Sequence, residues 1–188
     1  NWTRGLAEDA TFRSSWDAVR AEPRVRARGA TTYGADDART AVESGLFDVV
    51  QVEWNVLNQT VLDALGELPR RLGVRIAVRS VLLQGVLAGR PLPAHLAKLG
   101  AARARLTRVA GECGLSLPAL AIRAALDHPC VSHVLVGADA EEQLGPVIEA
   151  AGAAELGTTA RAACRELDQR GAQLVDPRAW PALEAQSR

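Results

Sequence analysis

Hydrogen-bonding side chains stand at or near the ends of three strand-like segments in this chain. Thr31 and Thr32 close the first segment, Gln51 lies inside the second, and Arg79 and Ser80 follow the third. Gln51 is unusual because its neighbours are valines, and a polar side chain in a buried run costs free energy unless it finds a partner. Side chains of these types can hydrogen-bond a polar ligand, and ordinary turn chemistry is the alternative for the two threonines.

Two further loops contain residues suited to close ligand contact. Leu82 and Gly85 come after the third strand-like segment, and a glycine there lets the backbone approach a ligand. Gly137, Asp139 and Gln143 come after a fourth segment and lead into a predicted helix near residue 140. A helix N-terminus offers free N–H groups and a favourable dipole to an anion, so this loop is a candidate phosphate site.

Alternating strands and helices must position these residues. Helical periodicity is present at residues 11–22, 36–44, 60–72, 92–114, 116–127, 140–151 and 158–170. Buried-strand patterns are present at residues 25–31, 47–52, 74–78 and 131–136. Asp36 and Ser116 are suited to cap the helices that follow them. Alternation at this spacing predicts a parallel sheet with helices outside it, either as an open sheet or as part of a barrel.

The composition argues against several classes of protein. Lys+Arg and Asp+Glu both number 22, so no net charge attracts the 188-residue chain to nucleic acid or to an acidic membrane. No segment has the ~20 apolar residues of a membrane span, and no signal peptide opens the chain. The cysteines (Cys113, Cys130 and Cys164) are scattered and the histidines lack metal spacing, so we expect neither disulfides nor a metal site. We expect one domain in a reducing cytoplasm, with no nucleic-acid or membrane partner.

Four short motifs follow the order and spacing of one known family. They are VRARGATTYG at residues 25–34, FDVVQVEWN at 47–55, VRSVLLQG at 78–85 and VLVGADAEEQL at 134–144. Together they resemble the fifth to eighth strands of the aldo/keto reductases of bacterial type, over about residues 12–151. The resemblance implies an α/β fold, namely the C-terminal half of a (β/α)8 TIM barrel with four parallel strands and outer helices. Residues 1–188 then form a single partial domain, with half-barrel βα units at 1–151 and a C-terminal helix and tail at 152–188.

The resemblance also implies a nicotinamide cofactor, NADP or NAD. Thr31, Thr32 and Gln51 match the residues that hydrogen-bond the carboxamide group, although the family usually has Ser-Asn where this chain has Thr-Thr. Arg79 matches the residue that stacks on the nicotinamide ring, a position that is aromatic in many relatives. A planar guanidinium can take the same stacking role.

The same resemblance assigns the phosphate and adenosine end of the cofactor. The matching positions are Ser80, Leu82, Gly85, Gly137 and Gln143. Asp139 occupies a position that is usually neutral or basic, where its carboxylate would repel a 2′-phosphate. The choice between NADP and NAD therefore stays open at this point.

The resemblance locates the family's catalytic Asp, Tyr, Lys and His upstream of Asn1, so we expect no catalytic residue in this chain. The start without methionine suggests a piece of a longer reductase that reduces a small aldehyde or ketone, and we expect this fragment alone to be inactive. Tyr33 and Lys98 are not expected to replace the missing residues. We expect the tail at residues 176–181 to pack against the barrel. The alternative is a non-catalytic half-barrel that binds a nucleotide or associates through its exposed edges.

Overall fold

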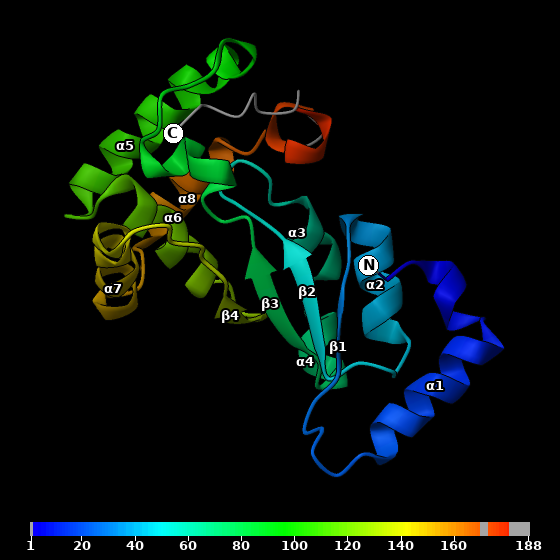
Figure 1. Cartoon of the computed structure of the whole chain (residues 1–188). Helices are drawn as coiled ribbons and strands as arrows, with labels where there is room; N and C mark the ends of the chain where they lie inside the picture. Colours follow the sequence, from blue (N-terminus) through cyan, green and yellow to red (C-terminus); the bar gives the residue numbers. More distant parts are fainter. Residues whose placement is uncertain (1, 170–172, 181–188) are drawn as a thin grey trace.

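The four predicted strands form one parallel sheet (Figure 1). The computed structural model describes residues 2–169 and 173–180. The strands are β1 (Gly29–Thr31), β2 (Val49–Glu53), β3 (Arg75–Arg79) and β4 (Val131–Val134), and they lie side by side in chain order. Every neighbouring pair is parallel. This confirms the predicted α/β fold with four parallel strands and is consistent with part of a (β/α)8 barrel.

Helices connect the strands and flank the sheet (Figure 1). The α-helices are α1 (Ala10–Ala21), α2 (Gly34–Glu43), α3 (Thr60–Leu65), α4 (Leu68–Leu72), α5 (Gly100–Glu112), α6 (Leu117–Leu126), α7 (Leu144–Gly152) and α8 (Thr158–Glu166). Shorter 3-10 helices span Arg4–Ala7, Leu83–Ala88, Ala94–Leu99, Glu141–Gln143, Gln173–Val175 and Pro177–Ala179. Among the described residues no single helix is long and apolar enough to cross a membrane. One bent pair of helical segments, Ala94–Glu112 and Leu117–Leu126, is together long and apolar enough by length and composition alone, and the two segments meet at 82°.

The hydrophobic core lies on one face of the sheet. Val50 and Val52 of β2 and Ile76 and Val78 of β3 are fully buried in a cluster with apolar helix residues. Each such side chain contributes about 1.5–3 kcal/mol on burial, so a register shift by one residue would lose several of these contributions at once. The intervening residues of β2 are only partly buried, Gln51 among them. The alternation thus fixes which face carries the polar side chains.

Several element boundaries differ from prediction, and two of the differences involve contacts between distant segments. The first strand begins at Gly29 and not at residue 25, and the Arg28 N–H donates to the Asp48 carboxylate at 2.8 Å. Asp36 does not cap α2, which begins at Gly34. The Gly34 N–H donates to Glu53 Oε1 at 2.7 Å, so a residue of the neighbouring strand serves the helix terminus.

Three predicted helices are divided or shortened. The helix at residues 60–72 is two helices, because Gly66 has φ 51° and ψ −131° and ends α3. The helix at residues 92–114 begins as a 3-10 turn before α5. The helix at residues 158–170 ends at Glu166, and Arg170 lies outside the described residues. Ser116 does cap α6, since its side chain accepts from the Ala119 N–H, and the three cysteines are free as predicted.

Candidate functional site

The strand pairing brings the predicted polar residues into two rows. In the lower row, Thr31 of β1 pairs with Gln51 of β2, which pairs with Ala77 of β3. In the upper row, Glu53 of β2 pairs with Arg79 of β3. Two residues along a strand advance it by roughly 6.6 Å, so the rows lie one layer apart on the same face. The upper row is at the carboxyl ends of the strands, toward which the C-terminal segment folds (Figure 1).

Thr31 and Gln51 form a hydrogen-bonding pair with complementary free groups. Thr31 Oγ1 donates to Gln51 Oε1 at 3.3 Å. Among the described residues, the structure shows no partner for Gln51 Nε2, and the Thr31 oxygen keeps its lone pairs. The pair therefore offers one N–H donor and one oxygen acceptor, which is the complement of a carboxamide group.

Thr32 has a different place from Thr31. Its side chain is 0% exposed, and its Oγ1 donates to the Gln51 main-chain oxygen at 3.3 Å. Its N–H donates to the same oxygen at 3.0 Å. Thr32 therefore fastens the end of β1 to β2.

Contacts along its edge and on one face fix the Arg79 guanidinium. Nη2 donates to the Thr32 main-chain oxygen at 2.9 Å and to Glu53 Oε2 at 3.3 Å. Nη1 donates to Ser80 Oγ at 3.3 Å. The Tyr33 ring centroid lies 4.3 Å from Arg79 Cζ, which is a cation–π contact. One face of the guanidinium is thereby covered by Tyr33, and its edge is held by oxygens, so its plane has a defined direction.

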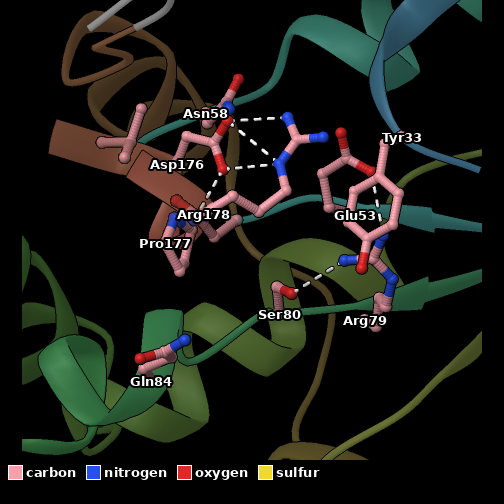
Figure 2. A pocket seen from close by; sticks show the side chains of 11 residues that line it. Tyr33, Glu53, Asn58, Arg79, Ser80, Gln84, Asp176, Pro177 and Arg178 are labelled. Carbon is pink, nitrogen blue, oxygen red and sulfur yellow. Dashed lines mark hydrogen bonds and ion pairs between the residues drawn. The ribbon is translucent and has the colours of Figure 1, made fainter. Parts of the chain in front are cut away.

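The C-terminal segment adds a second guanidinium to this stack. Arg178 Cζ lies 4.5 Å from the Tyr33 ring centroid, and Figure 2 shows the ring between Arg79 and Arg178. Arg178 also pairs with Asp176 through Nη2–Oδ2 at 2.7 Å and Nε–Oδ1 at 2.9 Å. This hydrogen bond from Arg178 is the main reason that the pKa of Asp176 lies below its ordinary value. The expected packing of the tail against the strands is therefore seen for the part of it that is described.

These residues surround a cavity of about 250 Å³ at the strand ends. Its lining comprises Tyr33, Glu53, Asn55, Asn58, Arg79, Ser80, Gln84, Val175, Asp176, Pro177 and Arg178. The two cations are each paired with a carboxylate, Arg79 with Glu53 and Arg178 with Asp176. The cavity is thus polar but balanced in charge, which suits a flat polar group better than a free anion.

A larger groove of about 660 Å³ adjoins this cavity, because Ser80 and Gln84 line both. Of the predicted positions, Ser80, Leu82, Gly85, Gly137, Asp139 and Gln143 all line the groove. Its volume lies within the range of about 300–1,000 Å³ that is typical of small-molecule sites. Residues separated by more than fifty positions in the sequence therefore meet in one groove.

One wall of the groove is a loop with unusual backbone geometry. Ser80, Leu83 and Gln84 have φ of 65°, 46° and 49°, and among the described residues these are the non-glycine positions with positive φ. Gly85 follows with φ 91°. Strained conformations of this kind cluster at ligand sites, where surrounding contacts hold them. Positive φ at three non-glycine positions sets this wall apart from the rest of the described residues.

The opposite wall follows β4 and is held by its own hydrogen bond. The Asp139 N–H donates to Gln143 Oε1 at 2.8 Å. Asp139 Oδ2 pairs with Arg90 Nη2 at 3.2 Å across the groove. The helix predicted near residue 140 begins there as the 3-10 turn Glu141–Gln143, with Ala140 as its N-cap, and becomes α-helical at Leu144. Pro146 explains the late start of α7, because a proline clashes with the carbonyl four residues earlier in an α-helix.

Several residues of the site were not predicted for it. Glu53 could have been found, because it lies two residues after Gln51 and so shares its face of β2. Tyr33 was considered only as a proton donor, whereas it stacks between guanidiniums. Arg178 carries no local signal of where the tail folds. Lys98, set aside as an acid–base partner, lines neither the cavity nor the groove.

Comparison with known proteins gives consistent matches. A model of the aldo/keto reductase family matches residues 17–169. The NADH-specific methylglyoxal reductase of Escherichia coli (strain K12) is 32% identical over 71 residues, which are 38% of this chain and 22% of that protein.

Solved structures show the same fold. An aldo-keto reductase from Bacillus halodurans in its holo form has a TM-score of 0.71 at 20% identity, covering 86% of this chain and 57% of that one. A glycerol dehydrogenase from Gluconobacter oxydans has a TM-score of 0.67 at 18% identity, covering 86% and 54%. The chain therefore spans little more than half the length of these two structures.

Proposed function

Because this chain belongs to the aldo/keto reductase family of oxidoreductases, we propose that its cavity and groove together bind a nicotinamide cofactor for carbonyl reduction. The observation that carries the proposal is the Thr31–Gln51 pair, which lines neither the cavity nor the groove but lies one layer below Arg79, a residue of the cavity wall, on the same face of the sheet. The pair's free donor and acceptor match a carboxamide, and Arg79 supplies a flat group on which an aromatic ring can stack. Thr32 supports the pair from the buried side.

The rest of the cofactor is assigned to the groove. Ser80, Leu82 and Gly85 form the wall along which we place the pyrophosphate, since the strained loop lets its main chain approach a ligand. Gly137 and Gln143 on the facing wall are assigned to the adenosine end. The cavity and groove share lining residues, which supports one elongated ligand in place of two separate ones.

Among the two cofactors, we propose NAD(H) in preference to NADP(H). Asp139 and Glu142 both line the adenosine end of the groove, and the Asp139 side chain is 83% exposed. Two carboxylates there oppose the extra phosphate of NADP(H) by like-charge repulsion. The matched segment of an NADH-specific reductase is in keeping with this preference.

The substrate in the proposal is a small aldehyde or ketone, and its reduction needs a general acid near the carbonyl oxygen. The chain spans little more than half the length of the solved relatives, and we assign the proton donor to the half of the barrel that this chain does not contain. Three apolar side chains that follow β4 in the chain are exposed, Leu135 and Leu144 at 45% and Ile148 at 71%, which favours a partner that covers them. We infer that the other half of the barrel docks against the β4 edge of the sheet, and that the chain alone binds cofactor without turnover.

The second candidate is a non-catalytic half-barrel that binds a nucleotide or associates with itself. The same exposed apolar side chains favour self-association. Sedimentation of the purified chain tests self-association, because a dimer that stays intact on dilution supports it and a monomer contradicts it.

The cofactor proposal is tested by titrating NADH and NADPH against the chain and following tryptophan fluorescence. We expect NADH to bind more tightly by about tenfold, from the charge repulsion at Asp139 and Glu142. Asp139→Arg should bring the two dissociation constants together, whereas the charge-matched control Glu112→Arg, which lines neither the cavity nor the groove, should leave their ratio unchanged. Tighter binding of NADPH would contradict the NAD(H) preference, and a lack of binding by both would refute the site.

A further inference from the structure

The charge of Arg79 has a consequence for the oxidation state of a bound nicotinamide ring. Its side chain is 20% exposed, and Tyr33 covers one guanidinium face. In the proposed function a planar ring stacks on Arg79, and because Tyr33 covers one face, that ring would use the opposite face.

The reduced and oxidised nicotinamide rings differ by one positive charge. The reduced ring is neutral, whereas the oxidised ring is a pyridinium cation. A cation stacked on the Arg79 guanidinium is repelled, and the repulsion is strongest where water is excluded. Glu53 offsets part of it, but its carboxylate meets the edge of the guanidinium at 3.3 Å and so is farther from a ring stacked on the face.

We propose that Arg79 makes this site select the reduced cofactor over the oxidised one, and that Glu53 limits the strength of the selection. This inference rests on the proposed function. The difference between the close repulsion and the more distant attraction corresponds to on the order of tenfold in affinity, at an effective dielectric constant of about 20. An aromatic ring in place of Arg79 has the opposite preference, because its face attracts a cation.

The selection of the reduced cofactor would favour carbonyl reduction over the reverse reaction. In an intact reductase, hydride transfer would be the chemistry that the cofactor supplies, and the Arg79 guanidinium would then face a positively charged ring. Arg79 would hold this oxidised form less tightly than the reduced form. Release of the oxidised cofactor is thereby favoured, and the site is left ready for another reduced molecule.

The test measures dissociation constants of NADH and NAD⁺ for the wild type and two variants. Arg79→Phe should lower the preference for NADH by about tenfold, since the repulsive charge is replaced by a ring. Glu53→Gln should raise the preference severalfold, because the offsetting charge is lost while an amide oxygen remains to accept from the Gly34 N–H. The control is Arg105→Gln, which removes a surface cation that lines neither the cavity nor the groove. Its NADH to NAD⁺ ratio should match the wild type.

The outcomes separate this inference from the proposed function. If neither form binds the wild type, the proposed site fails and the inference fails with it. If both forms bind and Arg79→Phe leaves their ratio unchanged, only the inference is overturned. If Arg79→Phe does not fold, Glu53→Gln decides, and an unchanged or lowered NADH preference overturns the proposal.

Discussion

Replacing Gly85 by alanine should disturb both the stability of the protein and its cofactor groove. The residue has φ +91°, a conformation that alanine adopts only with strain. An added Cβ would overlap Arg90 Cδ and lie 2.9 Å from Arg90 Nε. Arg90 would have to move, and its ion pair with Asp139 across the groove would break.

The expected loss can be assembled from these two effects. Alanine in a left-handed conformation costs about 1–2 kcal/mol. The exposed Arg90–Asp139 pair contributes no more than about 1 kcal/mol, because solvent screens it. Their sum of about 2 kcal/mol corresponds to a fall in Tm of roughly 4–8 °C for a chain of this size.

Thermal unfolding of four proteins measures the two parts separately. The proteins are the wild type, Gly85→Ala, Arg90→Ala and the double variant. On the Arg90→Ala background, only the backbone strain remains, so the effect of Gly85→Ala should fall toward 1 kcal/mol. Gly114→Ala is the matched control, since Gly114 also has positive φ (68°) but no atom within 4 Å of an added Cβ. NADH should bind Gly85→Ala severalfold more weakly and Gly114→Ala normally.

Two results would refute this reasoning. An unchanged Tm for Gly85→Ala would show that the loop does not hold a left-handed glycine. Equal shifts in the presence and absence of the Arg90 side chain would show that the two residues are not in contact.

Three further measurements test the charges and thiols of the fold. Burial raises the pKa of Cys130 and Cys164 to about 11, so iodoacetamide at pH 8 should label the exposed Cys113 first. Mass spectrometry follows the labelling, and rapid labelling of all three cysteines would contradict the packing. Burial lowers the pKa of His128 below 6.5, so in acid the unfolded state binds more protons than the folded state, and Tm should fall as the pH drops below about 6.5. The variant His128→Asn should flatten this dependence of Tm on pH. An equal dependence in both proteins would argue against burial of the imidazole. The lowered pKa of Asp176 means that its contribution is present above about pH 4 and is lost as the pH falls through that pKa. Asp176→Asn should therefore speed proteolysis of the C-terminal segment at pH 7, and an unchanged rate would show that the carboxylate does not hold it.

The parts of the fold that follow local rules could be predicted from the sequence. The valines around Gln51 identify a strand because burial on one face imposes a period of two, and Ser116 identifies a helix start because its side chain can accept from a nearby N–H. The motifs that resemble a family placed Ser80 and Gly137 on one ligand, and the structure brings both to one groove. Local patterns and the order of the motifs were thus sufficient to predict most of the architecture.

What could not be predicted depends on contacts between distant segments. No local pattern around Tyr33 indicates that Arg178 will lie over its ring, because the two are joined only by the fold. The start of α2 at Gly34 depends on a carboxylate from the next strand, so a search for a capping residue nearby selected Asp36. The backbone strain at residues 80–84 is likewise held by tertiary contacts, and no propensity scale indicates it.

The order of the strands has a consequence for how the protein folds. Short segments join β1 to β2 (residues 32–48) and β2 to β3 (residues 54–74), whereas residues 80–130 separate β3 from β4. Closing a longer loop costs more entropy, so β4 should dock last and open first. The groove wall from Gly137 to Gln143 follows β4 and forms only then. A bound cofactor would therefore stabilise the docked state of β4. Its binding should slow amide hydrogen exchange in β4 more than in the other strands.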